Sequence, residues 1–262
     1  MKQNLKRTFS GRRGWFLIGL SVVLTVIQLM TFNRTNYLYD PSLYLRIFPL
    51  DRTGYGVDLY SFLFPLIAAF YGGSFYAQDR QWNLQAFILG RMSRGSYYKR
   101  LYQSAFLAGG LAGIAPLGVH WGLFALGYPL RTVDTIQSQI NIVPETPEGF
   151  LFWLNHPLLT MGLFALVVFL AGGAWALAAL AVSYWVETPY FETLAPLLLA
   201  VFGMLLTELL GWPDLSPLNL TRLSSLLEMN LRALLFLALE FLGLVFLTGV
   251  IHRQELVGRW DA

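Results

Sequence analysis

Long apolar runs separated by short polar segments dominate the chain. A bilayer core is about 30 Å thick and needs roughly 20 mostly apolar helical residues to cross it. Six runs approach or exceed this length: 15–32, 59–76, 101–128, 158–186, 193–210 and 231–251. Because backbone polar groups inside a bilayer must be satisfied within the protein, this pattern predicts an all-α, polytopic membrane protein. We expect six transmembrane helices in a single domain over residues 1–262.

The composition agrees with this prediction and excludes several classes of function. Hydrophobic residues make up 56% of the chain and charged residues 13%, whereas soluble domains have about a quarter of their residues charged. With no Cys, the chain has no disulfide, thiolate metal site or cysteine nucleophile. A net charge of +3 is too small to indicate nucleic acid, so we expect membrane lipid as the environment.

Lys and Arg are concentrated in alternate polar segments. If the N-terminus is cytoplasmic, 12 of the 18 Lys and Arg residues lie on the inner side and 6 on the outer side. Since cytoplasmic loops carry the excess of these residues, we predict that both termini are cytoplasmic.

Small residues predict where the spans pack closely. The third run contains two small-x-x-x-small pairs, Gly109 with Gly113 and Gly118 with Gly122. The fourth run is also rich in glycine and alanine. Such residues let helix backbones approach each other in membranes. For any single pair, ordinary glycine enrichment in membrane spans is the alternative explanation.

The segment 211–230, GWPDLSPLNLTRLSSLLEMN, lies between the last two runs. Its leucines recur at helical spacing among polar residues. This pattern predicts a short amphipathic helix that lies at the outer interface or dips into the membrane. A packed loop is the alternative.

The segment 77–100, AQDRQWNLQAFILGRMSRGSYYKR, gathers charge between the second and third runs. Asp79 is a candidate N-cap and Gly90 a candidate end for a short helix outside the bilayer. That helix would carry three apolar side chains on one stripe: Leu84, Phe87 and Ile88. Ser93 or Ser96 would then cap the third span. Taken alone, the charge is explained by topology and contact with anionic lipid.

The order of residues in this segment resembles that in permease subunits of bacterial ABC transporters of the type 2 exporter class. In that family an acidic residue and Arg, a short apolar stretch and Arg-x-Ser-Arg-x-x-Tyr follow the second span. The matching residues here are Asp79, Arg80, the apolar residues from Leu84 to Leu89, Arg91, Ser93, Arg94 and Tyr97. The similarity in spacing covers residues 59 to about 126.

The resemblance implies that residues 77–100 include a cytoplasmic coupling helix, which rests in a groove of a separate ABC ATPase subunit. It also implies a basic interfacial helix within residues 1–14 and membrane-dipping helices within 211–230. The expected partners are that ATPase and a second copy of the permease or a similar permease. The expected location is the bacterial cytoplasmic (inner) membrane.

The chain has no nucleotide-binding loop of its own. A Walker A loop needs a Lys within Gly-x-x-x-x-Gly-Lys-Ser/Thr, and the only lysines are Lys2, Lys6 and Lys99, none in that setting. We therefore expect ATP and magnesium to be bound by the partner ATPase. No catalytic, cofactor or metal residue is predicted here, and the chain is not expected to be an enzyme.

Among the ionisable residues within the predicted spans, Glu240 lies near the middle of the sixth and His120 in the outer part of the third. A charge at mid-membrane costs on the order of 3 kcal/mol. Glu240 either lines a translocation path or is a neutral acid that bonds a neighbouring helix or holds a subunit interface. His120 is either a proton switch or a packed, hydrogen-bonded side chain. These residues motivate an alternative function, an ion-coupled secondary transporter, although no inverted repeat is apparent.

Overall fold

A computed structural model describes residues 2–31, 42–46, 54–131, 148–186, 190–228 and 231–258 of the chain. Every regular element in these ranges is helical, and none of the residues described forms a strand, which confirms the all-α prediction for them. The elements are α1 (Lys2–Phe9), α2 (Arg12–Thr31), η2 (Leu43–Arg46), α3 (Tyr55–Ala68), η3 (Ala69–Gly73), α4 (Phe75–Gln81), α5 (Leu84–Leu89), α6 (Arg94–Ala125), α7 (Glu148–Asn155), α8 (Pro157–Ser183), α9 (Phe191–Leu209), η4 (Pro213–Leu215), η5 (Pro217–Thr221), α10 (Leu223–Glu228) and α11 (Leu231–Gly258).

Among the residues described, six helices are long and apolar enough to cross a membrane. They are Arg12–Thr31, Tyr55–Gly73, Arg94–Ala125, Pro157–Ser183, Phe191–Leu209 and Leu234–Gln254. Each contains most of one apolar run, so the prediction of a multi-pass membrane protein with six spans is confirmed at the level of helix length and composition. Which side of the membrane the termini face stays a prediction.

The centre of the bundle is formed by α6 and α8, with the end of the second span between them. A Cβ atom on Gly109 would lie 2.3 Å from the Cβ of Ala176 and 2.7 Å from the carbonyl oxygen of Gly172. These helices therefore touch through their backbones, as the glycine pattern predicts. Gly118 and Gly122 have nothing within 4 Å of such a Cβ atom. Close packing through this second pair is therefore not found.

The second span ends in a π-helical turn, η3, which places two glycines against both central helices. A Cβ atom on Gly72 would lie 2.4 Å from the carbonyl oxygen of Ala105, and one on Gly73 would lie 2.1 Å from the Cβ of Ala179. The wider π turn occurs where this span meets both α6 and α8. The first four spans thus form one tightly packed unit.

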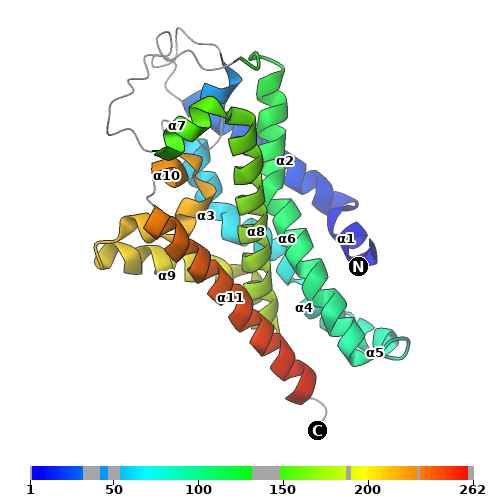
Figure 1. Cartoon of the computed structure of the whole chain (residues 1–262). Coiled ribbons are helices and arrows are strands. Elements are labelled where there is room, and N and C mark those ends of the chain that lie inside the picture. The colour runs from blue at the N-terminus through cyan, green and yellow to red at the C-terminus, as the bar shows by residue number, and fades with distance from the viewer. Residues whose placement is uncertain are drawn as a thin grey trace.

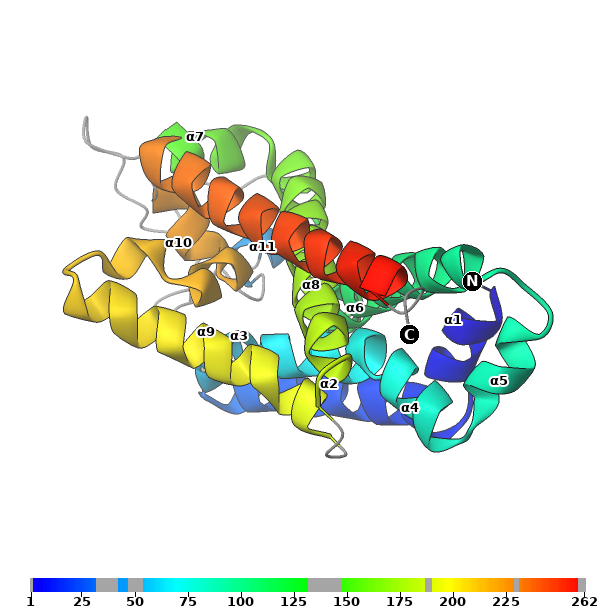
Figure 2. The ribbon, with the colours of Figure 1, turned by 90° about the horizontal axis from the view of Figure 1, so that it is seen from below.

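The last two spans lie at the edge of this unit. Figures 1 and 2 show α9 leaving α8 at a steep angle and α11 running along the outside of the bundle. In the most apolar stretch of α11 only 11% of residues are buried, against 67% in α8. Most of the α11 surface therefore faces lipid or another protein.

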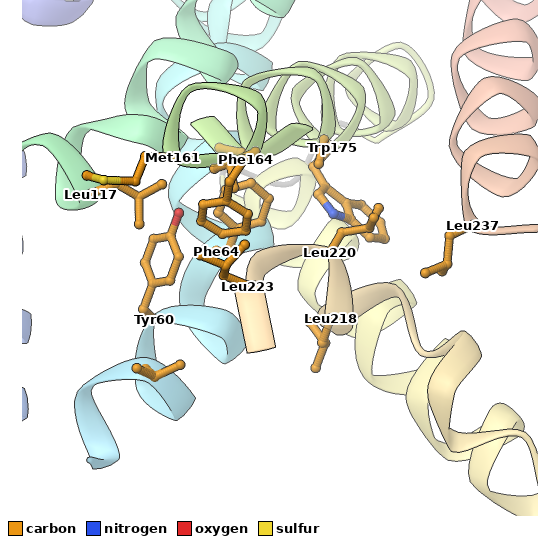
Figure 3. Packing of buried hydrophobic residues seen from close by; sticks show 14 of the residues in the cluster. Tyr60, Phe64, Leu117, Met161, Phe164, Trp175, Leu218, Leu220, Leu223 and Leu237 are labelled. Carbon is orange, nitrogen blue, oxygen red and sulfur yellow. The ribbon is translucent and has the colours of Figure 1, made fainter. Parts of the chain in front are cut away.

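The segment between these two spans folds back onto the bundle. Leu218, Leu220 and Leu223 are buried in the main hydrophobic cluster together with Phe64 and Trp175, and Figure 3 shows these side chains converging. Of the two interpretations of residues 211–230, the packed segment is the one observed over the residues described, with α10 as its short helix. At its exposed edge Arg222 forms an ion pair with Asp58 at 2.7 Å.

Candidate functional site

The segment singled out by the sequence lies at one end of the bundle. Figure 1 shows α1, α4, α5 and the end of α11 together at this end, opposite α7 and α10. The ends of α8 and α11 and the start of α9 lie here too, because Arg80 bonds to Val186, Tyr184 bonds to His252, and Glu192 lines a cavity together with Arg80. Polar side chains from α1, α4 and α6 are hydrogen-bonded to one another at this end.

Asp79 is the centre of this arrangement. Its side chain is only 3% exposed, and both carboxylate oxygens accept hydrogen bonds. Arg7 Nη1 donates to Oδ1 at 2.9 Å, and the Tyr97 hydroxyl donates to Oδ2 at 3.0 Å. The Arg7 guanidinium also lies over the rings of Phe75 and Trp82, at 5.8 and 5.6 Å from their centroids. We call Arg7, Asp79 and Tyr97 the Asp79 network; it fastens α1, α4 and α6 together through charge-assisted bonds.

The prediction that Asp79 is an N-cap is wrong. Asp79 lies inside α4, which continues the second span beyond the π turn, and Asn83 in a left-handed conformation (φ 52°) precedes α5 instead. A carboxylate suits either role, and here its oxygens are occupied by side chains from α1 and α6.

Arg80 also turns toward the bundle. Its Nη2 donates to the carbonyl oxygen of Val186, just after α8, at 2.9 Å, and its guanidinium lies 6.0 Å from the ring centroid of Tyr76. The bond links α4 to the junction between the fourth and fifth spans. Arg80 therefore serves as an internal tie at this end of the bundle.

The short helix predicted within residues 77–100 is present as α5, and Gly90 follows its last residue. Its apolar side chains lie in different environments, so the prediction that they form one apolar stripe is wrong. Ile88 packs on the buried tyrosines and Leu84 is half-buried, whereas Phe87 is 73% exposed. The six-residue helix turns Ile88 inward and Phe87 outward.

The turn after α5 presents two arginines and then caps the third span. Arg91 and Arg94 are exposed. Ser93 is the N-cap of α6, and its Oγ accepts a hydrogen bond from the Ser96 N–H at 3.4 Å. We call Phe87, Arg91 and Arg94 the α5 surface. Of the predicted coupling residues, Asp79 and Tyr97 are buried and Arg80 is half-buried, and we call these three the inward-facing group.

Sequence reasoning missed two partners of the site. Arg7 counts in the sequence only as one basic residue of the N-terminal segment, and it lies 72 positions from the carboxylate that it binds. His252 is buried, and its Nδ1 shares a hydrogen bond with the Tyr184 hydroxyl, which joins α8 to α11 beside Tyr98. The run of tyrosines at the start of the third span is the one local signal of this cluster.

The two intramembrane candidates lie apart from this end and from each other. His120 is buried in α6 and stacks on Phe124, with ring centroids 4.0 Å apart. Glu240 is exposed on the outer side of α11, and it makes no hydrogen bond or ion pair with any residue described. The interpretation of Glu240 as an acid bonded to a neighbouring helix of the same chain is thus not found over these residues.

Metal-binding clusters are also absent from the described part of the chain, where no three His, Asp or Glu side chains gather closely enough to hold an ion. No known protein family, curated protein or solved structure matches the chain. The geometry of this end of the bundle and the order of residues within 77–100 are therefore the features that bear on function.

Proposed function

We propose that the chain is the membrane-spanning permease subunit of an ATP-driven ABC exporter, which couples ATP hydrolysis by a separate ATPase subunit to export of an amphipathic substrate. The observation that carries this proposal is the α5 surface. Phe87 is a large apolar side chain that is 73% exposed on a helix outside the apolar spans, beside two exposed arginines. An exposed aromatic flanked by Arg is typical of protein interfaces.

The inward-facing group, Asp79, Arg80 and Tyr97, gives such an interface a mechanical connection to the spans. A partner that pushes on α5 acts on α4, and α4 is tied to α1 and α6 by Asp79 and to the end of α8 by Arg80. Charge-assisted hydrogen bonds of this kind are about twice as strong as neutral ones. Movement of the partner would therefore displace the first four spans together.

The ATP-binding machinery belongs to the partner in this proposal. The chain has only three lysines, none of them in a phosphate-binding loop, so the ATPase would supply the sites for ATP and magnesium. This chain would contribute the membrane path and the docking surface.

An apolar groove supports an amphipathic substrate. It lies between α8 and α11 beneath α7 and α10, has a volume of about 640 Å³, and is lined by side chains such as Phe164, Val167, Leu227 and Phe241. A groove of this size accommodates the apolar part of a drug-sized molecule or an acyl chain.

The outward position of Glu240 supports a second permease beside α11. A charged carboxyl group that faces lipid near mid-membrane has a free-energy cost on the order of 3 kcal/mol. Contact with a polar group of another chain would remove this cost. We therefore place the second copy, or a similar permease, against α11.

The proposal is tested by purifying the tagged chain from its native membrane and measuring ATP hydrolysis in the eluate. We expect an ATPase to co-purify. Reversing the charges of the α5 surface, Arg91→Glu with Arg94→Glu, should reduce the bound ATPase activity by about tenfold, the equivalent of losing ~1.4 kcal/mol of binding free energy. Phe87→Asp should do the same.

Arg131→Glu is the matched control because Arg131 is also exposed but follows the opposite end of α6. It should leave co-purification unchanged, and all variants should insert normally. ATP-independent, proton-driven uptake by vesicles containing only this chain would contradict the proposal. If Glu240→Gln abolished that uptake, the result would support the alternative ion-coupled transporter.

A further inference from the structure

The apolar groove between α8 and α11 is bordered by one face of each helix. Residues three or four positions apart lie on the same face of an α-helix. The lining residues follow this spacing, with Leu163, Val167, Leu170 and Ala174 on α8 and Leu234, Ala238, Phe241 and Val245 on α11. A volume of about 640 Å³ remains between the two faces. They therefore form the walls of a groove along both helices instead of packing fully against each other.

The groove opens sideways, toward the surroundings of the bundle. At one end α7 and α10 touch through their backbones: a Cβ atom on Gly149 would lie 2.6 Å from the carbonyl oxygen of Leu227. Along the side, Leu163 and Leu170 of α8 and Leu242 of α11 form rims that are 48%, 49% and 64% exposed. Both helices are long and apolar enough to cross a membrane, so these rims contact the hydrocarbon of the bilayer. A ligand of the groove therefore enters from the membrane.

The lining does not suit water as the content of the groove. Of the lining side chains that the structure describes, only that of Thr160 carries a polar atom, and its hydroxyl already donates to the carbonyl oxygen of His156 at 3.0 Å. A water molecule in a cavity needs about two to four polar partners. If the groove were empty, its walls would lose their dispersion contacts. Hydrocarbon is the content that avoids both costs.

The length of the groove matches the hydrocarbon of one leaflet. Its lining on α8 extends from Thr160 to Ala174, which corresponds to ~21 Å at about 1.5 Å per residue. One leaflet contributes about half of a hydrocarbon core that is ~30 Å thick. The groove begins in the first turn of α8, so it covers the half of the membrane on the side of α7 and α10. An acyl chain of that leaflet therefore fits lengthwise.

The place proposed for a second permease lies on a different side of α11. Glu240 is not among the lining residues of the groove. It is two positions from Ala238, which corresponds to ~160° around the helix. A second copy that contacts Glu240 therefore leaves the groove open to lipid.

We propose that this groove binds one acyl chain of a membrane lipid. The chain lies lengthwise between α8 and α11, with its terminal methyl group near Ala174 and Val245 and its headgroup outside the groove at the α7 end. The identity of the exported substrate as a lipid with such a chain rests on the proposed function, whereas binding of the chain does not.

The test uses the full chain in vesicles of phosphatidylcholine, a small fraction of which carries a photoreactive diazirine in one acyl chain. After irradiation, mass spectrometry locates the labelled residues. Leu198 and Phe202, which are 58% and 65% exposed on α9, report ordinary contact with lipid. Labelling of Val167 and Phe241 in the groove should exceed theirs by about fivefold, the equivalent of ~1 kcal/mol of preference. ATP and the ATPase are absent, so the result is independent of whether an ATPase co-purifies.

Two tryptophan variants at neighbouring positions test whether the groove itself is occupied. Ala238 is an exposed residue of the groove wall, so Ala238→Trp fills the groove and should reduce its labelling by about fivefold. Leu239→Trp is the matched control, because Leu239 is 66% exposed on the same helix but does not line the groove. It should change the labelling by less than about twofold. Thermal unfolding establishes that each variant is folded, and Leu242→Trp at the rim repeats the test if Ala238→Trp is not.

Three results would overturn the proposal. Equal labelling of the groove and of α9 would mean that the groove has only ordinary contact with lipid. Labelling of α9 without the groove would mean that protein covers the groove. Equal effects of Ala238→Trp and Leu239→Trp would assign the labelling to the outer surface of α11.

Discussion

Replacing Asp79 by Asn removes the charge at the centre of the network while keeping the size of the side chain. Asp79 accepts one bond from a guanidinium and one from a phenol, and its side chain is 3% exposed. Hydrogen bonds to a charged group contribute about 1.5–3 kcal/mol each, and breaking a buried pair costs about 3–5 kcal/mol. We therefore expect Asp79→Asn to lower the free energy of unfolding by about 3 kcal/mol.

The ion pair at the opposite end of the bundle provides the control. Asp58 and Arg222 are 2.7 Å apart, but their side chains are 56% and 36% exposed. Exposed pairs contribute about 0–1 kcal/mol and are screened by salt. Asp58→Asn should therefore cost less than ~1 kcal/mol, even though the contact is shorter than that between Arg7 and Asp79.

The assay is reversible unfolding of the purified chain in mixed micelles, followed by tryptophan fluorescence and circular dichroism. A double-mutant cycle with Arg7→Gln and Asp79→Asn should give a coupling energy of about 2 kcal/mol, within the range for residues in contact. If Asp79→Asn costs less than ~1 kcal/mol, or no more than Asp58→Asn, the network does not hold these helices together and cannot pass movement from α5 to α1 and α6.

Other predictions test the packing at single positions by the same unfolding measurement. Gly109→Ala should cost about 1–3 kcal/mol, because its methyl group would lie 2.3 Å from another, whereas Gly118→Ala, with open space around it, should cost nothing; equal effects would contradict the described packing. Tyr184→Phe should cost about 1 kcal/mol through loss of its hydrogen bond to His252, and no change would mean that this bond does not tie α11 to the bundle. Phe87→Asp should stay within about 0.5 kcal/mol of the parent chain, because the side chain is exposed; a larger loss would mean that Phe87 is packed and unavailable to a partner.

The spans were predictable because hydrophobicity over about 20 residues is a local property of the chain. Packing between them was predictable only in part. Gly109 and Gly118 carry the same small-residue spacing, yet only Gly109 meets another helix closely. The spacing allows close approach, and the direction in which each face points depends on the neighbouring helices.

The polar network was not predictable because its partners are distant in sequence. Arg7 and Asp79 are separated by 72 positions, and Arg80 and Val186 by 106. No periodicity links such residues, and the sequence alone favoured a local role for Asp79 as a helix cap. The short helix α5 was predictable from its local pattern, whereas the burial of Ile88 and the exposure of Phe87 depend on how that helix sits on the tyrosine cluster.

The arrangement of the spans also has a consequence for how the protein is made. The hydrogen bonds of Arg7, Asp79 and Arg80 involve only residues up to Val186. The same is true of the packing of η3 against α6 and α8. At about 5–20 residues per second, a ribosome needs several more seconds to complete the chain beyond that point. The first four spans are thus able to assemble in the membrane while α9 and α11 are still being synthesised, and the two late helices then attach to a surface that already exists.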